Sequence, residues 1–344
     1  MALLLQRSLS SCSAAGRKAA AGLLSFSPRC GLLSRRASSD YALPSLASEL
    51  DLRARGGVRH GLVEWERDGP LVLFLHANSL CAGAWAPVVA HLPGVHAVAC
   101  DQRAHGNSDA PVGPGAYSWR TIGEDFVRIV EAVTQRCGRP PAACVTHSFA
   151  GDCALLALAE RPLQVGRMIL LDPVLADAEG AGQGAERLAK GTRRLGEREA
   201  AGFDSAEAVG DSLERLLRAS LAREALHPAA KSAFAQFGSY LDSGGRWRLK
   251  CLRDNEAAIY ANRVALADHL ADKRVQTEVR LVFAGKRRGK PELHEAAYRR
   301  DWGEATRVVE RCGAGSAVQQ LDGVGHFLVL EAPELVAETL RELL

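Results

Sequence analysis

The sequence predicts an α/β fold in which a mostly parallel sheet is flanked by helices and carries a helical insertion. Short apolar runs alternate with helical patterns, and their continuous apolar character is typical of strands buried on both faces. One interval of more than 100 residues separates two of these strands, and an interval of that length should hold structure of its own. The predicted buried strands cover residues 71–75, 95–100, 142–146, 168–171, 279–283 and 317–321.

The chain enters this sheet through a predicted hairpin. Residues 50–53 and 62–65 alternate between apolar and polar side chains, with Gly56 and Gly57 between them. The first buried strand, 71–75, then ends in His76-Ala77-Asn78. The second leads into the motif Asp101-x-Arg103-x-His105-Gly106-x-Ser108, and residues 119–137 follow with a helical pattern.

Ser148 stands where the third buried strand meets an Ala- and Leu-rich helical pattern. Small residues lie two positions before and after it, Thr146 and Ala150, and Gly151 follows directly. This is the sequence form of a nucleophile elbow, a strained turn that admits only small residues beside the serine. A serine at the start of a helix can also be a simple N-cap, so the other motifs decide the interpretation.

The remaining motifs supply partners for such a serine. His326 follows the strand 317–321 and precedes a helix that Pro333 opens. In an acyl-transfer hydrolase, the loop after the first buried strand and the residue after the nucleophile each lend a backbone N–H to the oxyanion hole. We therefore expect Asn78 and Phe149 to be the two donors.

From about residue 58 to the end, these four motifs in this order resemble the α/β-hydrolase superfamily. Its members usually have glycine where Ala77 and Ala104 stand here. Segments 192–194, 247–251 and 255–260 are similar to a cap-bearing branch that includes a fungal peroxisomal lipase-like group. The resemblance implies an α/β-hydrolase fold and a serine hydrolase that uses Ser148 as nucleophile and His326 as general base.

The acid of such a triad has two candidates. In most of the superfamily it follows the strand placed here at 279–283, which would be near Arg288, but no acid stands there. Asp172 directly follows the strand 168–171, and Glu292 follows Pro291. We favour Asp172, because a strand terminus can hold a carboxylate rigidly, although Asp before Pro173 is also common as a turn or cap residue.

The long interval is interpreted as a helical cap over residues 176–272. Residues 185–195, 206–221 and 256–270 have helical periodicity. The cap should lie above the carboxyl ends of the strands and enclose an apolar pocket. Residues 40–175 and 273–344 would then form the hydrolase core.

Composition excludes several other functions. The net charge of +3 on 344 residues gives no footprint for nucleic acid. The nine cysteines are scattered without a Cys-x-x-Cys pair, and no clustered Cys/His set is present, so we expect reduced thiols, no metal and no cofactor. The glycines at 180–184 lack the spacing of a phosphate loop. His76, His105 and His147 are expected to be structural.

Residues 1–39 contain six basic residues and many serines but no acidic residue. This composition is typical of a disordered organelle transit peptide, with the mitochondrion as the first destination and the chloroplast as the alternative. The Leu3-Leu4-Leu5 patch is too short to span a membrane stably.

Two function classes follow from the sequence. The first is a serine hydrolase that cleaves a small-molecule ester with a lipid-like or other apolar acyl group. The second is a catalytically weak or inactive scaffold that binds a ligand or partner, which Ala77, Thr146 and Ala150 favour. Thioester, amide and carbon–carbon bond cleavage also stay open within the first class, and the oligomeric state is not indicated.

Overall fold

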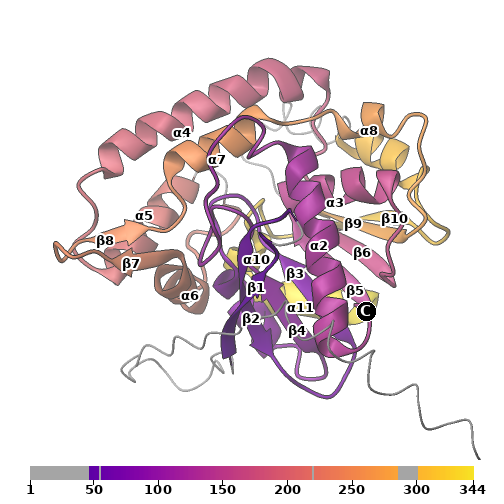
Figure 1. The fold of residues 1–344 in the computed structure, drawn as a ribbon, viewed down its shortest axis with the longest axis horizontal. Coiled ribbons are helices and arrows are strands. Elements are labelled where there is room, and N and C mark those ends of the chain that lie inside the picture. The colour runs from indigo at the N-terminus through magenta and orange to yellow at the C-terminus, as the bar shows by residue number, and fades with distance from the viewer. Residues whose placement is uncertain (1–45, 54–55, 219–220, 286–300) are drawn as a thin grey trace, which may run out of the picture.

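The computed structural model describes residues 46–53, 56–218, 221–285 and 301–344. The predicted transit peptide and Glu292 lie outside the described residues, and the transit peptide and its organelle stay predictions. The α/β fold with a mostly parallel sheet is confirmed (Figure 1).

An eight-stranded sheet forms the centre of the molecule, in the order β1-β2-β4-β3-β5-β6-β9-β10. Strand β2 runs antiparallel to both of its neighbours, and all pairs from β4 to β10 are parallel. The leading hairpin and every predicted buried strand are present within two residues of their predicted bounds, except that β1 begins four residues earlier and β2 begins three residues earlier. The strands are β1 Leu46–Asp51, β2 Arg59–Trp65, β3 Leu71–Leu75, β4 His96–Cys100, β5 Ala143–His147, β6 Arg167–Leu171, β9 Glu278–Ala284 and β10 Ala317–Leu321.

Helices cover both faces of this sheet. Alternate strand residues point to opposite faces, so Leu73 packs into one core cluster and Phe74 into the other. Helices α2 and α3 and the helical residues 301–309 cover the first face, whereas α1, α10 and α11 cover the second. Their bounds are α1 Ala86–Ala90, α2 Trp119–Cys137, α3 Phe149–Glu160, α10 Leu328–Glu331 and α11 Pro333–Leu343, and a short 3₁₀ turn, η2 Ala82–Trp85, precedes α1.

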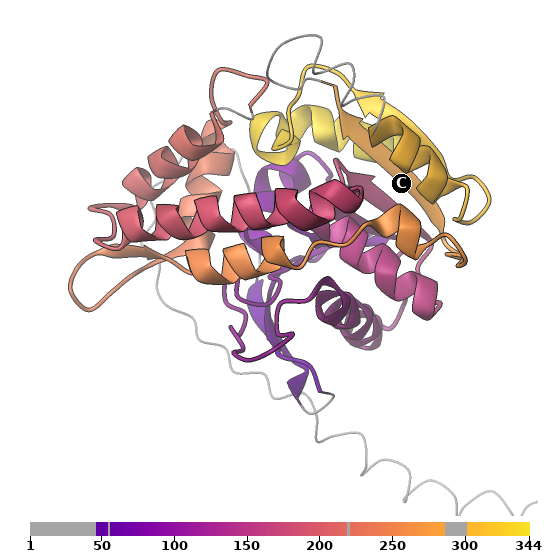
Figure 2. The same ribbon diagram turned by 90° about the horizontal axis from the view of Figure 1, so that it is seen from above.

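The interval between β6 and β9 holds structure of its own, as its length predicted. Helices α4 and α7 run side by side over the end of the sheet (Figures 1 and 2). The elements are the π-turn η3 Gly180–Gly184, α4 Ala185–Glu199, α5 Ala206–Leu217, α6 Pro228–Gly238, β7 Ser239–Leu241, β8 Trp247–Leu249, α7 Arg253–Ala261 and α8 Leu266–His269.

Two local predictions in this interval were wrong. The expected helix over 256–270 is broken, because the Asn262 side chain donates to the Ala258 carbonyl at 2.7 Å and ends α7 there. The interval is also not wholly helical, since β7 and β8 form an antiparallel hairpin. Its turn is held by Asp242 Oδ1, which accepts the N–H groups of Gly244 and Arg246 at 2.9 Å each.

A third apolar cluster joins the interval to the core. Leu213 of α5 and Phe234 of α6 pack against Leu80, which lies in the loop after β3. Helices α5 and α6 therefore pack against the loop after β3, which is expected to carry an oxyanion donor. Among the described residues, no helix has the length and apolar character needed to cross a bilayer.

Candidate active site

Ser148 occupies a strained turn between β5 and α3. Its backbone angles, φ 58° and ψ −134°, lie in a region that residues with a side chain rarely adopt. The Ser148 N–H donates to the Leu171 carbonyl at 3.0 Å, and the residue is only 6% exposed. The strand, turn and helix predicted around Ser148 are thus all present.

Close packing between α3 and β6 explains the glycine near Ser148. A Cβ added at Gly151 would lie 2.8 Å from Leu170 Cγ and 2.9 Å from Thr146 Oγ1. Helix α3 therefore approaches strand β6 too closely for a side chain at this position. Gly151 shares the role that the spacing assigned to Thr146 and Ala150.

The structure brings Asp172 and His326 together. His326 Nδ1 lies 2.6 Å from Asp172 Oδ2, and Asp172 Oδ1 accepts the Ala284 N–H at 2.9 Å. The Asp172 N–H also donates to the Val282 carbonyl at 2.7 Å. Strand β9 thus fixes the direction of the carboxylate, which places the His326 proton on Nδ1 and leaves Nε2 as the acceptor.

Ser148, Asp172 and His326 line one cavity. Among the described residues, no hydrogen bond partner is present for the Ser148 hydroxyl; contacts of this kind often tighten only in the complex with substrate. Glu292, the other candidate acid, lies outside the described residues, so the structure gives geometry for Asp172 alone.

His147 holds the backbone of the histidine loop. It is completely buried, and its Nε2 lies 2.7 Å from the His326 carbonyl oxygen. Burial, together with the neighbouring His326 ring, lowers the pKa of His147 to about 3. A neutral imidazole that donates to a carbonyl agrees with the structural role expected for this residue.

His105 and His76 fix the loop after β3 in a similar way. His105 Nε2 accepts the Ser79 N–H at 3.1 Å, and its Nδ1 lies 2.9 Å from the Arg103 carbonyl. His76 Nε2 accepts the Gln102 N–H at 3.0 Å. Burial lowers the pKa of His105 to about 4 and also lowers that of His76, so both rings are neutral.

The two expected oxyanion donors lie at the ends of adjacent strands, Asn78 after β3 and Phe149 after β5. Phe149 is the first residue of α3, so its N–H has no acceptor within the helix. The Asn78 side chain is anchored by donating to the Glu256 carbonyl at 3.1 Å, which fixes its backbone beside the cavity. Asn78 and Ser148 line the same cavity, as an oxyanion hole requires.

The cavity has a volume of about 1050 Å³ and extends from Ser148 to helix α4. The sequence predicted an apolar pocket, and this was wrong in part. Leucines and Phe327 line it, but arginines and acidic residues line it as well. Helix α4 is amphipathic, and the pattern alone did not show that part of its charged face meets the cavity.

Asp152 was missed by the sequence analysis. It is fully buried one turn into α3, where its carboxylate accepts the Val174 N–H at 3.0 Å and the Leu175 N–H at 2.9 Å. These bonds hold the loop that begins with Asp172. The signal was present in the sequence, since an aspartate in an otherwise apolar helix requires buried partners.

Glu331 was missed for the same reason. Its Oε2 accepts the Gly325 N–H at 3.3 Å and the Ala222 N–H at 2.8 Å, and the residue is 1% exposed. It therefore connects the histidine loop to the chain between α5 and α6. A single acid within the apolar run 328–332 was the available signal.

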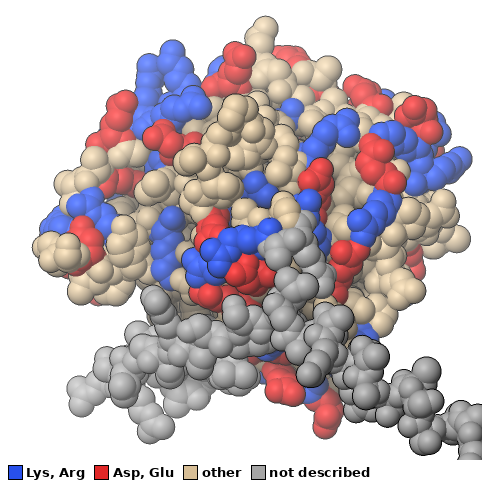
Figure 3. Space-filling view, in the orientation of Figure 1, with Lys and Arg blue, Asp and Glu red and all other residues tan. Residues whose placement is uncertain are grey.

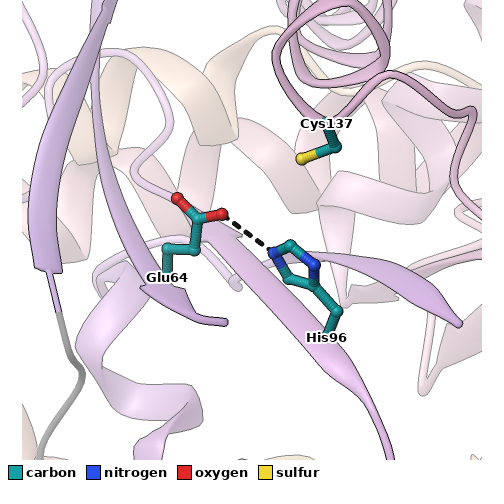
Figure 4. Close-up of side chains that lie close together, drawn as sticks. All are labelled: Glu64, His96 and Cys137. Carbon is teal, nitrogen blue, oxygen red and sulfur yellow. Dashed lines mark hydrogen bonds and ion pairs between the residues drawn. The ribbon is translucent and has the colours of Figure 1, made fainter. Parts of the chain in front are cut away.

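One group of potential metal ligands occurs among the described residues, and it lies away from Ser148. The ligand atoms of Glu64, His96 and Cys137 are within 4.8 Å of one another (Figure 4). Glu64 Oε1 is 2.8 Å from His96 Nε2, and its Oε2 accepts from Arg136 Nε at 3.1 Å. His96 begins β4, whereas Ser148 follows the last residue of β5, so the two lie at opposite ends of the parallel strands. Both Glu64 oxygens already have partners, in His96 and Arg136.

The fold and the serine elbow define the class to which the chain belongs. The model of the alpha/beta hydrolase family matches residues 72–339. The chain is a member of this family, and membership indicates a small-molecule substrate.

The individual proteins that the chain resembles share little of its sequence. The chain is 35% identical to the lipase LipV of Mycobacterium tuberculosis (strain ATCC 25618 / H37Rv) over 105 residues, which are 30% of this chain and 38% of that protein. The M. tuberculosis esterase Rv0045c has a similar structure, with a TM-score of 0.62, 19% identity, and 88% of this chain and 92% of that chain covered. A thioesterase domain from the curacin biosynthetic pathway gives a TM-score of 0.61, 19% identity, and 86% and 99% coverage. The two structures show the shared fold alone.

Proposed function

We propose that the chain is a serine hydrolase that cleaves carboxylic esters through Ser148, His326 and Asp172. The observation that carries the proposal is the 2.6 Å contact between His326 Nδ1 and Asp172 Oδ2 in the cavity that holds the strained Ser148. A histidine with its Nδ1 proton engaged by a carboxylate has Nε2 available to take a proton from serine.

The reaction proceeds through an acyl-enzyme. His326 Nε2 takes the Ser148 proton while Oγ bonds to the ester carbonyl carbon, and the carbonyl oxygen becomes an oxyanion. The Asn78 and Phe149 N–H groups bind that oxygen, each contributing about 3 kcal/mol. The tetrahedral intermediate collapses, and the leaving alcohol takes its proton from His326.

Water then repeats these steps in the second half of the reaction. The water oxygen attacks the acyl carbon while His326 takes a proton from the water. His326 then gives this proton to Ser148 Oγ as the carboxylic acid is released. Asp172 stays ionised and stabilises the imidazolium formed in both halves.

The acyl part of the substrate is proposed to be apolar. Leu175, Leu188, Leu195, Leu217 and Phe327 line the cavity and offer contact surface to an aliphatic chain. The match to a lipase supports an ester as the substrate.

A series of 4-nitrophenyl esters from acetate to dodecanoate tests this function. We expect turnover by the full chain, with a preference for a medium or long acyl chain, and its loss in Ser148→Ala. Ser243→Ala is the matched control, because Ser243 is exposed in the β7–β8 turn. Equal rates in both variants would mean that Ser148 is not the nucleophile, and no rate with any ester would favour the inactive scaffold.

A further inference from the structure

Four arginines line the cavity of the candidate site: Arg187, Arg194, Arg198 and Arg263. The first three lie on α4 at spacings of seven and four residues, which places them along one face of the helix. Basic and acidic side chains both stand along the top of the molecule, where α4 runs (Figure 3). None of the four forms a salt bridge with a residue in the described ranges, although Arg187 Nη1 lies 3.5 Å from Gln183 Oε1.

Arg263 is the most enclosed of the four. It follows α7, and its guanidinium carbon lies 5.6 Å from the centre of the Tyr260 ring. Its Nε is buried and has no hydrogen bond acceptor within the described part of the chain. Burial lowers the pKa of Arg263, because removal from water disfavours the charged form.

Arg253, ten residues earlier, is the informative comparison. This buried arginine pairs with Glu199 Oε2 at 2.8 Å and with Glu256 Oε2 at 2.6 Å. The fold therefore compensates the buried cation that joins α4 to α7. Within the described residues it leaves Arg263, the cation that faces the cavity, without such a pair, although an isolated buried charge is costly.

Several acids close to the cavity already have partners. Asp152 contributes a favourable charge, but its two oxygens accept the Val174 and Leu175 N–H groups. Asp172 is bound to His326, and Glu256 is bound to Arg253. Three further acids line the cavity, of which Asp177 accepts the Gly180 N–H at 2.7 Å; the other two are Glu179 and Asp301.

We propose that the ester substrate carries an anionic group, a carboxylate or a phosphate, and that Arg263 binds it. This inference rests on the proposed function. A guanidinium matches both anions through paired N–H donors, and the three arginines of α4 would attract the anion to the cavity. The apolar acyl chain lies against the leucines, so the substrate is an amphiphilic anionic ester.

The position of Arg263 fits a group distant from the scissile bond. Arg263 interacts electrostatically with Asp152, which lies four residues beyond Ser148 on α3. Arg263 lines the same cavity as Ser148, but in the described part of the chain it is bonded to neither Asp172 nor His326. The anion would thus determine which ester binds without taking part in proton transfer.

Two esters of equal chain length test the inference. Mono-4-nitrophenyl suberate ends in a carboxylate, whereas 4-nitrophenyl octanoate ends in a methyl group. We expect the full chain to have a higher kcat/KM for the suberate. Arg263→Gln should lower the ratio of the two values by on the order of ten- to a hundredfold, the range for a hydrogen bond to a charged group. Arg193→Gln, on α4 but outside the cavity lining, should retain the ratio.

Competition for Ser148 identifies the anion. Octanoate and octyl phosphate should each slow fluorophosphonate labelling of Ser148 more than 1-octanol does, and the stronger competitor indicates the preferred group. Arg263→Gln should remove this difference. If that variant does not fold, the double variant Arg194→Gln, Arg198→Gln changes exposed side chains only and should reduce the same ratio by a smaller factor.

The two proposals fail in different ways. If Ser148 is labelled and the octanoate ester is cleaved, but the suberate has no advantage or keeps it in Arg263→Gln, the anion site is refuted and the esterase stands. If Ser148 is not labelled and neither ester is cleaved, the proposed function fails and the anion site fails with it.

Discussion

Replacing Asp172 by asparagine changes one atom that faces His326. Asp172 Oδ1 accepts the Ala284 N–H, and Oδ2 accepts from His326 Nδ1 at 2.6 Å. Asparagine can keep the first bond through its carbonyl oxygen, but it turns an NH₂ group toward His326. The donor then favours the tautomer with its proton on Nε2, which cannot take a proton from Ser148.

The expected loss in kcat is on the order of 10⁴-fold, as for the equivalent change in other triads, which corresponds to about 5.5 kcal/mol in the activation barrier. Folding should be affected much less. The φ of Asp172 is 42°, and asparagine tolerates this left-handed conformation as well as aspartate does. KM should change little, because the carboxylate is turned to His326 and to β9.

The assay is steady-state hydrolysis of 4-nitrophenyl octanoate by Asp172→Asn and by Glu292→Gln, with thermal unfolding measured on both variants. We expect a large loss in kcat for the first variant alone. Equal, minor losses in both would mean that the chain works as a Ser–His dyad or does not hydrolyse esters. A large loss in Glu292→Gln alone would move the acid to the position that is usual in the superfamily.

Two further predictions concern the elbow and its histidine. Gly151→Ala should lower the free energy of unfolding by about 1–3 kcal/mol, because the added methyl group overpacks against Leu170. Gly182→Ala is the control, since a Cβ there meets nothing within 4 Å. Denaturant titration measures both variants, and equal stabilities would refute the close approach of α3 to β6. The pKa of His147 is about 3 in the folded chain and 6.5 in the unfolded chain. Below pH 6.5 the unfolded chain therefore binds a proton that the folded chain does not, and the free energy of unfolding falls as the pH falls. Relative to His147→Gln, the native chain should lose up to about 1.4 kcal/mol per pH unit between pH 6.5 and 4.5; a constant difference would show that His147 is not held neutral.

The sheet could be predicted because its strands are buried on both faces. Residues 71–75 and 142–146 are continuous apolar runs, and burial on both faces leaves few other interpretations of such runs. Helix α2 was predicted with its observed bounds, since Ser118 caps its start by accepting the Thr121 N–H and Gly138 ends it with a φ of 68°. Local chemistry determines these elements.

The site was only partly predictable. Ser148, Asp172 and His326 each follow a strand, so motif and position identified them as candidates and the structure brings Asp172 and His326 together. Asp152 and Glu331 act through backbone N–H groups distant in sequence, and no local pattern shows which groups those are. The polarity of the cavity depended on how α4 and α7 pack, which is a tertiary property.

The central claim is that Ser148 is a nucleophile activated by His326. Its most direct test is labelling of the full chain with a fluorophosphonate, followed by mass analysis of the peptide that contains residue 148. The account predicts one covalent adduct per chain, located on Ser148, with loss of labelling in Ser148→Ala and much slower labelling in His326→Gln. An adduct that persists in Ser148→Ala, or a rate that does not change in His326→Gln, would contradict it.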